Sequence, residues 1–470
     1  MPMNSLFPKG FTDQVARDLG PDFLDFDPET RQIYGQDWSG ILKPNPSAVA
    51  FPRTTEQVSQ LLSACFEHGV PVVPSGGRTG LSGGACAAKG ELVLSLVRMN
   101  ALGTVDPATR TVRVQAGAVT EAVHRHCEPQ GLTWPVDFAS KGSSTVGGNL
   151  STNAGGVRVI RYGNTRAWVQ SIELVTPEGE VLELNGELEK NNTGFDLRQL
   201  VMGAEGTLGV ITSATLKLVP LPKRSDVLFF SLTDMEAVIR LFSFARESGL
   251  PISAFETLSA ACYRESVQFF GMKAPIEDAP EVGAYALLEV EDLEAGDLLL
   301  ETFLEQVFSQ SLALDGVLAQ NPREARDLWR LREGVAEAVL HQSLVHQHDV
   351  SVPVSKLPEF SARIEAQYAR DYPEFEVFIF GHIGDGNLHI FIRAQKESGK
   401  EEFLKRCKAS DSALFQFVKD FKGSVSAEHG IGLLKKPALP YSRSAAEISL
   451  MKGIKQAFDP KGILNPGKLI

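Results

Sequence analysis

Residues 378–391 restrict the fold of this chain more than any other segment, because an Asp-Gly pair there separates two apolar runs. This pattern is the strongest short-range signal for a β-hairpin with a two-residue turn. With Asp385 and Gly386 in the turn, the predicted register places His382 directly opposite His389 on one face of the sheet. Their Cβ atoms are then expected about 4.5–5.5 Å apart. Two imidazoles at that separation can bind one metal ion, so the segment predicts a ligand pair.

A carboxylate and a further histidine stand side by side at Glu428 and His429, among small residues. A carboxylate completes the two-histidine, one-carboxylate set that suits Zn²⁺, with Mn²⁺ or Fe²⁺ as alternatives. An imidazole beside a metal-bound substrate is a natural general base near neutral pH. We therefore predict His382, His389 and Glu428 as metal ligands and His429 as the base.

Composition limits the classes of protein to which the chain can belong. Its 470 residues are enough for two or three domains, and 43% hydrophobic with 22% charged residues is ordinary for a globular protein. The net charge of −12, without a basic block, argues against a nucleic-acid partner. No apolar run is long enough for a transmembrane helix, and residues 1–10 do not read as a signal peptide. The five cysteines are scattered, and we expect a reducing cytoplasmic setting.

A glycine-rich loop follows the first clear helix and strand. Thr54-Thr55-Glu56-Gln57 reads as a capping box, and a short strand is expected at 70–73. The loop at 74–84 then offers backbone N–H groups suited to binding phosphate. A dinucleotide-binding Rossmann site needs a helix after such a loop, whereas residues 91–97 read as a strand. The loop therefore predicts an anion site in a different fold.

Two further segments are rich in small residues. Residues 145–156, followed by Arg161-Tyr162-Gly163, combine glycines with Asn and Ser side chains, and residues 203–212 form the third segment. Dense small residues allow a flat ligand to lie against the backbone, while Asn and Ser supply hydrogen bonds. Three such loops suit an extended cofactor that carries a pyrophosphate and a planar ring.

These three segments resemble the FAD domain of the vanillyl-alcohol-oxidase and p-cresol-methylhydroxylase type. The segments at 381–389 and 426–430 resemble the C-terminal half of FAD-linked D-2-hydroxy-acid dehydrogenases, as do those at 190–197 and 459–468. The similarity extends from about residue 43 to 468. D-2-hydroxyglutarate dehydrogenases, D-lactate dehydrogenases and glycolate oxidase subunits are the branches that it indicates.

The resemblance implies FAD as the cofactor, with residues 75–79 at the pyrophosphate. Some relatives attach the flavin covalently through a histidine in the first loop, but Arg78 stands there in this chain. The resemblance therefore implies non-covalent FAD. The implied FAD-binding residues are Pro74, Ser75, Gly76, Gly77, Arg78, Thr79, Gly80, Ser82, Gly83, Pro135, Asp137, Ser144, Thr145, Gly147, Gly148, Asn149, Ser151, Asn153, Ala154, Gly155, Tyr162, Glu205, Gly206, Gly209, Ile211 and Asn465.

A domain boundary is expected at Pro220-Leu221-Pro222, where two prolines end a strand. Beyond it, strands at 227–231, 252–256 and 285–290 alternate with helices at 234–247 and 293–308. This split βαβ pattern predicts a ferredoxin-like cap. The acidic run at 289–297 is expected to be solvated surface.

The fold is predicted as α+β, with an N-terminal segment (1–42), a PCMH-type FAD-binding domain (43–222), a cap or substrate domain (223–422) and a C-terminal segment that packs on the FAD domain and completes the active site (423–470).

Arg332, in a helix expected to begin at Trp329, matches the family position that binds the substrate carboxylate, and guanidinium suits a bidentate pair. The other residues predicted to contact the substrate are Gln347, His348, Asn387 and Phe391. His346 and His348 share one strand face; lining the substrate pocket is the preferred interpretation there, with a second metal site as the alternative.

The chain departs from its relatives at two of these positions. D-2-hydroxyglutarate dehydrogenases commonly have lysine at the position of Gln347 and asparagine at that of Phe391. Glutamine does not replace the charge of the lysine, and phenylalanine does not replace the amide of the asparagine, although both groups help to bind a dicarboxylate. These differences favour a monocarboxylate or a bulkier apolar 2-hydroxy acid.

The chain is thus predicted to be an FAD- and metal-dependent dehydrogenase that oxidises a D-2-hydroxy acid to the 2-oxo acid by hydride transfer to flavin N5. Two alternatives are a transferase of the alkylglycerone-phosphate synthase type and a non-catalytic flavoprotein subunit of a glycolate oxidase-type complex. The expected electron acceptor is an electron-transfer flavoprotein, a quinone or a cytochrome. The sequence does not determine the oligomeric state, for which a homodimer is one option.

Overall fold

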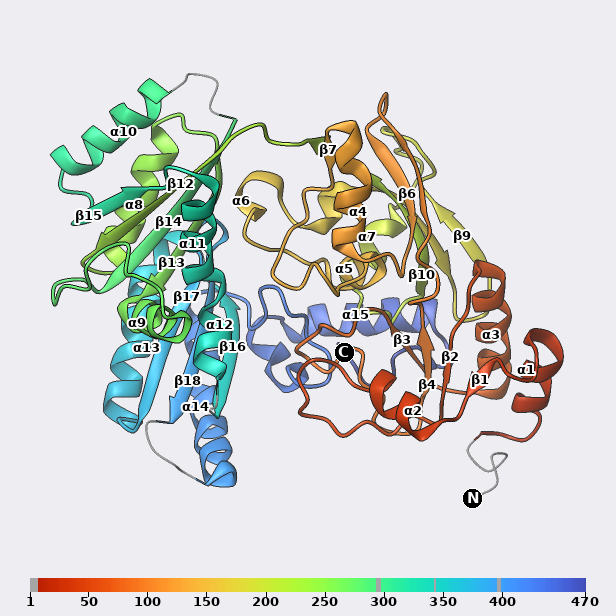
Figure 1. Cartoon of the computed structure of the whole chain (residues 1–470). Helices are drawn as coiled ribbons and strands as arrows, with labels where there is room; N and C mark the ends of the chain where they lie inside the picture. Colours follow the sequence, from red (N-terminus) through yellow and green to blue (C-terminus); the bar gives the residue numbers. More distant parts are fainter. Residues whose placement is uncertain (1–6, 293–296, 342–343, 395–398) are drawn as a thin grey trace. The chain divides into compact units, whose positions relative to one another are not determined.

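The computed structural model describes residues 7–292, 297–341, 344–394 and 399–470 (Figure 1). The chain divides into two compact units. The first unit contains residues 1–156, 163–221 and 428–470, and the second contains residues 157–162 and 222–427. Residues 1–42 therefore belong to the first unit. The short segment 157–162 belongs to the second unit, although no sequence signal marked it.

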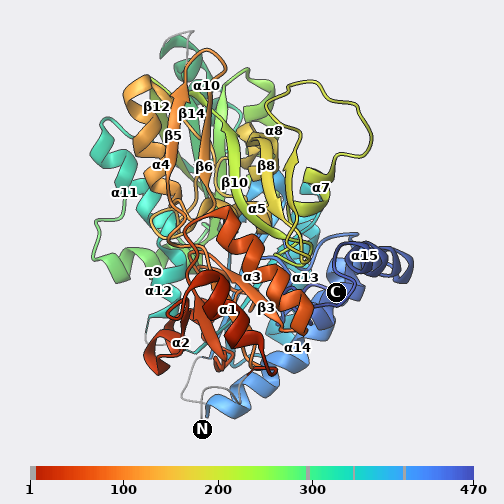
Figure 2. The ribbon, with the colours of Figure 1, turned by 90° about the vertical axis from the view of Figure 1, so that its right-hand side faces the viewer.

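The first unit contains a four-stranded sheet in the order β1-β2-β4-β3, in which β2, β4 and β3 are parallel and β1 is antiparallel. Helices α1 and α3 lie side by side beside this sheet (Figure 2). The elements are α1 (Phe11–Leu19), β1 (Leu24–Asp25), α2 (Pro28–Tyr34), β2 (Ala48–Ala50), α3 (Thr55–His68), β3 (Val72–Ser75) and β4 (Leu92–Ser95).

An antiparallel five-stranded sheet in the order β5-β6-β10-β8-β9 completes the core of this unit, with a two-stranded β11-β7 ribbon beside it. Its elements are β5 (Leu102–Asp106), β6 (Thr111–Gln115), α4 (Thr120–Cys127), β7 (Leu132–Thr133), α5 (Val146–Thr152), β8 (Val169–Val175), β9 (Val181–Leu184), α7 (Leu197–Val201), β10 (Val210–Lys217), β11 (Val219–Pro220) and α15 (Ala445–Phe458).

The predicted start of helix α3 is confirmed. The Thr54 side chain accepts a hydrogen bond from the Gln57 N–H at 3.3 Å, as an N-cap residue does. Gln57 in turn accepts from the Arg53 N–H at 2.7 Å. Gly69 ends the helix in the left-handed region with φ 68°, where glycine has no Cβ to clash. The strand that follows this helix is the one that leads into the glycine-rich loop.

The second unit is built on one antiparallel seven-stranded sheet in the order β15-β12-β14-β13-β17-β18-β16. Its first four strands have the 4-1-3-2 order of a ferredoxin-like fold, with α9 inserted. The elements are α6 (Val159–Tyr162), β12 (Ser225–Leu232), α8 (Met235–Glu247), β13 (Ile252–Ser259), α9 (Ala260–Phe270), β14 (Ala284–Glu291), α10 (Asp297–Ser309), β15 (Asp315–Leu318), α11 (Pro322–Glu333), α12 (Val335–Leu340), β16 (Val345–Ser351), α13 (Leu357–Asp371), β17 (Phe375–His382), β18 (Asn387–Ala394) and α14 (Lys400–Asp420).

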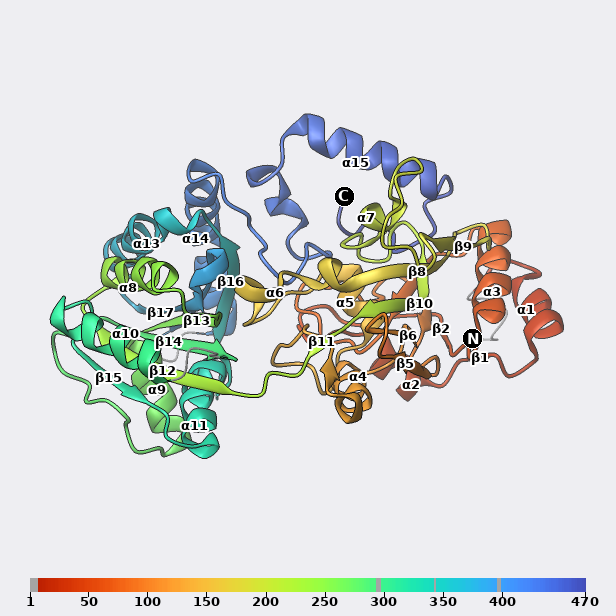
Figure 3. The same cartoon turned by 90° about the horizontal axis from the view of Figure 1, so that it is seen from above.

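Helices cover both faces of this sheet (Figure 3). Helices α9, α11 and α12 pack on the face that carries Leu258, Phe380 and Phe391, which we call face A. Helices α8, α13 and α14 pack on the opposite face, face B, where Phe242 of α8 meets Phe255 at a ring-centroid distance of 4.9 Å. Because alternate residues of a strand point to opposite faces, each strand contributes side chains to two separate cores, one on each face of the sheet.

The predicted register of the 378–391 hairpin is wrong by two residues. His382 pairs with Asn387, and His389 pairs with Phe380. A shift of one residue would have moved every side chain to the other face, whereas a shift of two keeps the faces unchanged. His382 and His389 therefore share face A as diagonal neighbours instead of directly opposed ones.

The turn explains the shift. A two-residue type I′ turn needs positive φ at both central residues, but of Asp385 and Gly386 only Gly386 has it, with φ 77°. The chain instead forms a 3-10 turn at Ile383–Asp385. The Asp385 carboxylate accepts from the Asn387 N–H at 3.1 Å and stabilises this longer loop.

Two other expectations in this unit are corrected. The segment that starts at Trp329 ends a helix instead of beginning one, because Asn321 caps α11 and Pro322 occupies its first turn. The acidic run is not solvated surface at Glu289 and Glu291, which are 3% and 1% exposed. The part of the run at 293–296, which also opens the predicted helix 293–308, lies outside the described residues.

None of the described helices combines the length and the apolar character that crossing a bilayer requires.

Two glycines of the first unit give a matched test of its packing. A Cβ at Gly117 would lie 2.0 Å from the Leu96 carbonyl oxygen, whereas a Cβ at Gly453, inside α15, meets nothing within 4 Å. We expect Gly117→Ala to lower the melting temperature. Gly453→Ala should raise it slightly, since alanine in a helix is favoured by about 0.5–1 kcal/mol. Thermal unfolding of both variants checks this, and equal shifts would contradict the packing described here.

Candidate active site

The first two glycine-rich segments pack against each other in the first unit. A Cβ at Gly76 would lie 2.3 Å from Thr145 Oγ1, and a Cβ at Gly77 would lie 2.1 Å from the Ser143 carbonyl oxygen. Only glycine permits so close an approach of the two backbone segments. The loops at 74–84 and 143–156, which are far apart in sequence, therefore form one surface of backbone groups.

The third segment and the C-terminal end of the chain join the same surface. The Glu205 N–H donates to the Ser151 carbonyl at 2.8 Å. The Asn465 side-chain amide donates to the carbonyls of Glu205 and Gly84, at 2.6 and 3.1 Å. The segments that the sequence predicted to bind FAD thus converge within one unit.

This surface fits a bound dinucleotide. The hydroxyl oxygens of Ser75 and Thr145 are buried without a hydrogen-bond partner among the residues that the structure describes. Buried hydroxyls in proteins are normally satisfied, so two in adjoining glycine loops fit a site for a polar group such as pyrophosphate. Arg78 has a left-handed backbone, with φ 60°, and its guanidinium lies 4.3 Å from the centroid of the Tyr34 ring.

Several predicted cofactor residues have internal roles. The Asn149 amide donates to the Thr120 hydroxyl at 2.7 Å, and that hydroxyl lies 2.8 Å from Ser144 Oγ. A Cβ at Gly209 would lie 2.7 Å from Leu174, so this glycine serves packing in the first unit.

Tyr162, another predicted cofactor residue, lies in the second unit. Its hydroxyl donates to Glu291 at 2.6 Å. Burial and this carboxylate raise the pKa of Tyr162 to about 12. Arg158 lies 3.1 Å from Glu289 and 3.3 Å from Glu291. These contacts attach segment 157–162 to the sheet of the second unit and explain why the two glutamates are buried.

The loop that carries His429 is held within the first unit. Ser82 Oγ donates to the His429 carbonyl at 2.9 Å. The Glu205 carboxylate accepts from the N–H groups of Ile431 and Gly432, at 2.7 and 2.8 Å. Burial raises the pKa of Glu205, and these two N–H groups oppose the rise. Glu205 therefore positions the loop after His429, a role that sequence reasoning missed.

The second unit brings His382 and His389 together on face A. Their Nε2 atoms are 3.4 Å apart, and the two rings meet edge to face. Both side chains are buried, at 7% and 8% exposure. His382 Nδ1 lies 2.8 Å from the Glu256 carboxylate. When Nδ1–H donates to that carboxylate, Nε2 is the basic nitrogen, which is the tautomer that a metal ligand needs.

This spacing fits a divalent metal. Two ligand atoms about 2.0–2.1 Å from a tetrahedral Zn²⁺ lie roughly 3.3–3.4 Å apart. The third predicted ligand, Glu428, is the first residue of the last segment of the other unit. Ser426, two residues earlier, hydrogen-bonds to Asp349 at 3.4 Å, and Asp349 pairs directly with His389. The chain therefore leaves the second unit next to the histidine pair.

Glu256 also contacts the predicted substrate arginine. Arg332 Nη2 lies 2.7 Å from Glu256 Oε2, and the Arg332 side chain is 5% exposed. Its guanidinium lies 5.1 Å from the Phe380 ring centroid. Arg332 Nε has no hydrogen-bond partner within the described part of the chain. Sequence reasoning missed Glu256; its only signal was a carboxylate in the otherwise apolar and hydroxyl-rich strand β13.

The other predicted substrate residues do not all lie on the same face of the sheet. Gln347 and Phe391 pair directly on face A, where Phe391 also packs against Phe380. The Asn387 amide nitrogen donates to Asp349 and to the Val350 carbonyl, both at 2.9 Å, so it connects two strands. His348 lies on face B, because it is adjacent to Gln347 in strand β16. The expectation that His348 lines the same pocket as His382 is therefore wrong.

Comparisons with known proteins agree with this architecture. Residues 46–185 match the family described as FAD binding domain, and residues 221–469 match FAD linked oxidases, C-terminal domain. The chain is 45% identical to a D-2-hydroxyglutarate dehydrogenase of Xanthomonas citri pv. viticola, over 95% of this chain and 94% of that protein. It is 44% identical to one of Stutzerimonas stutzeri (94% and 95%) and 36% identical to the mitochondrial one of Bos taurus (94% and 80%).

Solved structures share the fold. An alkyldihydroxyacetonephosphate synthase superposes with a TM-score of 0.75 at 20% identity, covering 98% of this chain and 86% of that one. p-Cresol methylhydroxylase superposes with a TM-score of 0.75 at 17% identity, covering 98% of both chains. At these identities the likeness concerns the fold alone. From its family matches and its relatives, the chain belongs to the FAD linked oxidases and is an FAD-dependent oxidoreductase that acts on a CH–OH group.

Proposed function

We propose that this chain oxidises a D-2-hydroxy acid to the corresponding 2-oxo acid, with FAD as the acceptor and a divalent metal at the substrate. The observation that carries the proposal is the buried Glu256 carboxylate, which contacts both Arg332 and His382. It connects a cation suited to a carboxylate with a histidine pair suited to a metal. A 2-hydroxy acid has both of the groups that such a site recognises.

Arg332 would hold the substrate carboxylate. Its guanidinium is buried, and Nε lacks a hydrogen-bond partner among the described residues. A carboxylate placed there would satisfy that donor and form a charge-assisted pair, which is stronger than a neutral hydrogen bond. The Glu256 contact restrains the guanidinium before the substrate arrives.

His382, His389 and Glu428 would hold the metal. When bound, a divalent ion supplies a Lewis acid that lowers the pKa of a coordinated hydroxyl, as zinc lowers that of water from about 15.7 to about 7. The Nε2–Nε2 distance of 3.4 Å supports the two histidine ligands. Glu428 is supported by its chemistry and by the position of Ser426 beside Asp349.

His429 would take the hydroxyl proton on a ring nitrogen. FAD, when bound, supplies the acceptor for the hydride that leaves C2, so the proton and the hydride together account for the two-electron oxidation to the 2-oxo acid. The hydrogen bonds from Ser82 to the His429 carbonyl and from the Ile431 and Gly432 N–H groups to Glu205 keep the base's loop in place.

The side chain of the substrate is the point on which two arguments differ. The names of the relatives indicate D-2-hydroxyglutarate. Gln347 is uncharged and Phe391 has no polar group, so this pair on face A lacks the cation that we expect for a second carboxylate. The residues therefore predict that D-lactate or a bulkier apolar acid is oxidised at least as efficiently as D-2-hydroxyglutarate.

Two alternatives are less well supported. The fold is shared with a synthase at 20% identity, and at that identity the likeness concerns the fold alone. A non-catalytic flavoprotein subunit would not need the buried Arg332–Glu256–His382 arrangement. The electron acceptor we propose is an electron-transfer flavoprotein, a quinone or a cytochrome.

Anaerobic reduction of the flavin tests the function. We expect D-lactate, D-2-hydroxyglutarate and apolar D-2-hydroxy acids, offered beside their L-enantiomers, to bleach the flavin absorbance with the D-forms strongly preferred. Comparing the rates among the D-acids decides the side-chain question. If no 2-hydroxy acid bleaches the flavin, the proposed oxidation is wrong.

His429→Asn should leave FAD and metal content unchanged while flavin reduction slows by at least about 10²-fold, the lower end for loss of a general base. His126→Asn, a histidine that lies near the Gly103 carbonyl, is the matched control and should reduce at the normal rate. Loss of bound metal in His429→Asn would make this residue a ligand instead of the base.

FAD is expected to be bound tightly but not covalently, because Arg78 stands where a tethering histidine occurs in some relatives. Acid precipitation should move all of the yellow colour into the supernatant. Flavin absorbance that stays with the washed pellet would show a covalent bond.

Glu256→Leu should lower the free energy of unfolding by about 3–5 kcal/mol, because it leaves the buried Arg332 charge without its partner. The double variant with Arg332→Leu should cost less than the sum of the two single changes, since both charges then leave the interior. Arg264→Leu, which breaks a more exposed pair with Asp278, should change stability by about 1 kcal/mol or less.

In the same series, Glu256→Gln should weaken metal binding about 10- to 100-fold, as loss of the carboxylate behind a ligating histidine typically does. Additive stability losses together with unchanged metal binding would contradict the positioning role of Glu256.

A further inference from the structure

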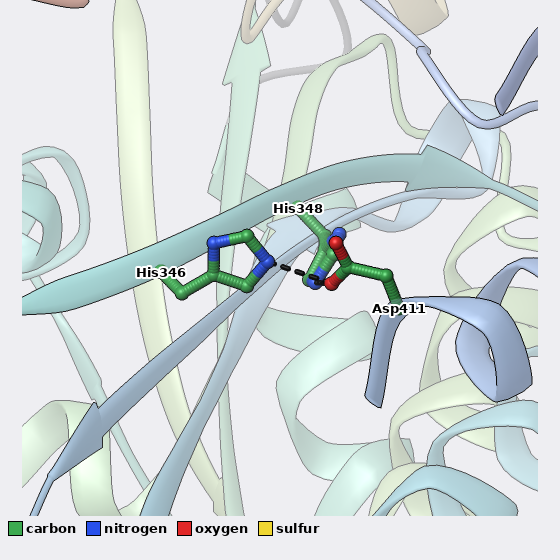
Figure 4. A group of neighbouring side chains, drawn as sticks. All are labelled: His346, His348 and Asp411. Carbon is green, nitrogen blue, oxygen red and sulfur yellow. Dashed lines mark hydrogen bonds and ion pairs between the residues drawn. The ribbon is translucent and has the colours of Figure 1, made fainter. Parts of the chain in front are cut away.

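A second group of convergent ligand atoms lies on face B of the second unit. His346 and His348 stand two residues apart in strand β16, so both side chains point to the same face. Asp411 is contributed by α14, which packs across that face. Figure 4 shows both imidazoles turned toward the Asp411 carboxylate.

The distances are those of a ligand set. His346 Nε2 lies 2.7 Å from Asp411 Oδ1, and His348 Nε2 lies 3.3 Å from the same oxygen. One ligand atom from each residue lies within 4.8 Å of the other two. Since two ligands of a tetrahedral Zn²⁺ lie roughly 3.3–3.4 Å apart, small side-chain rotations are enough to place an ion among them.

The surroundings also suit an ion. The side chain of His348 is 5% exposed, whereas those of His346 and Asp411 are 25% and 21% exposed. One side of the group therefore faces solvent, from which an ion and its water ligand can enter. The two rings stand edge to face at 89°, so their nitrogens approach the carboxylate from different directions.

The charge state of the carboxylate is appropriate as well. Burial would raise the pKa of Asp411, but the hydrogen bonds and charges of His346 and His348 outweigh it and hold the pKa well below its usual range. Asp411 is thus ionised at neutral pH. An ionised carboxylate offers oxygen lone pairs to a cation, as a metal ligand must.

We propose that His346, His348 and Asp411 form a second metal site, which takes Zn²⁺ or another borderline divalent ion and completes its coordination with water. Two imidazoles and one carboxylate are the ligand types that such ions prefer. The site is distinct from the histidine pair His382 and His389, which lies on face A. It joins α14 to strand β16, and it stands independently of the proposed function.

Zinc stoichiometry of the FAD-loaded full chain tests the proposal. After treatment with a chelator, the protein is dialysed against buffers of fixed free Zn²⁺ concentration, and bound zinc is measured. Asp411→Asn is compared with Asp420→Asn, a matched change on the same helix at an exposed residue that pairs with Arg363. We expect Asp411→Asn to bind one Zn²⁺ fewer per chain than the wild type, and Asp420→Asn to bind the wild-type number.

A second variant makes the test independent of the folding of the first. His346→Gln changes a partly exposed side chain and should lose the same single ion. The double variant His346→Gln with Asp411→Asn should also lose only one, because both residues bind the same metal. Equal zinc content in wild type and both single variants at every concentration would overturn the proposal, and so would the loss of two ions in the double variant. Flavin reduction by 2-hydroxy acids is measured separately, so failure of the proposed oxidation and failure of this site are distinguishable.

Discussion

The carboxylate of Glu256 is the contact on which the site in the second unit depends. It lies in the sheet interior, 2.7 Å from Arg332 and 2.8 Å from His382. Burying an isolated charge is costly, so the carboxylate and the guanidinium each require the other. The same carboxylate selects the imidazole tautomer in which His382 Nε2 is basic and faces His389. One buried acid thereby sets the geometry of both groups that we propose to bind the substrate and its metal.

Because side chains alternate along a β-strand, one sheet can carry a different group of functional side chains on each of its two faces. In strand β16, Gln347 points to face A beside Phe391, while His346 and His348 point to face B, where Asp411 of α14 meets them. Separation by a single layer of backbone keeps the two groups of ligands from competing for one ion. In the first unit, one residue likewise has two roles. Glu205 belongs to a glycine-rich segment, and its carboxylate also accepts a hydrogen bond from the backbone after His429.

The hairpin shows how far local pattern reaches. Its two apolar runs and its Asp-Gly pair predict two strands and a histidine on each, and both strands form. The predicted register failed because the Asp385 side chain binds the Asn387 N–H and lengthens the turn. His382 and His389 still lie on the same face, because the register differs from the predicted one by an even number of residues. The prediction that Glu289 is solvated failed for another reason: Arg158, distant in sequence, neutralises it.

The sequence by itself determined the FAD-binding class, the N-terminal cap of α3, the succession of strands and helices in the second unit and the identity of the histidine pair. Each of these depends on residue types within a short window, where turn chemistry and side-chain periodicity decide the conformation. Only the tertiary structure decided that Glu256 joins Arg332 to His382, and that His348 faces Asp411 instead of the pocket. Those contacts join segments that are distant in the chain, and they arise because buried charges must find partners among whatever groups the packing of the sheet brings near.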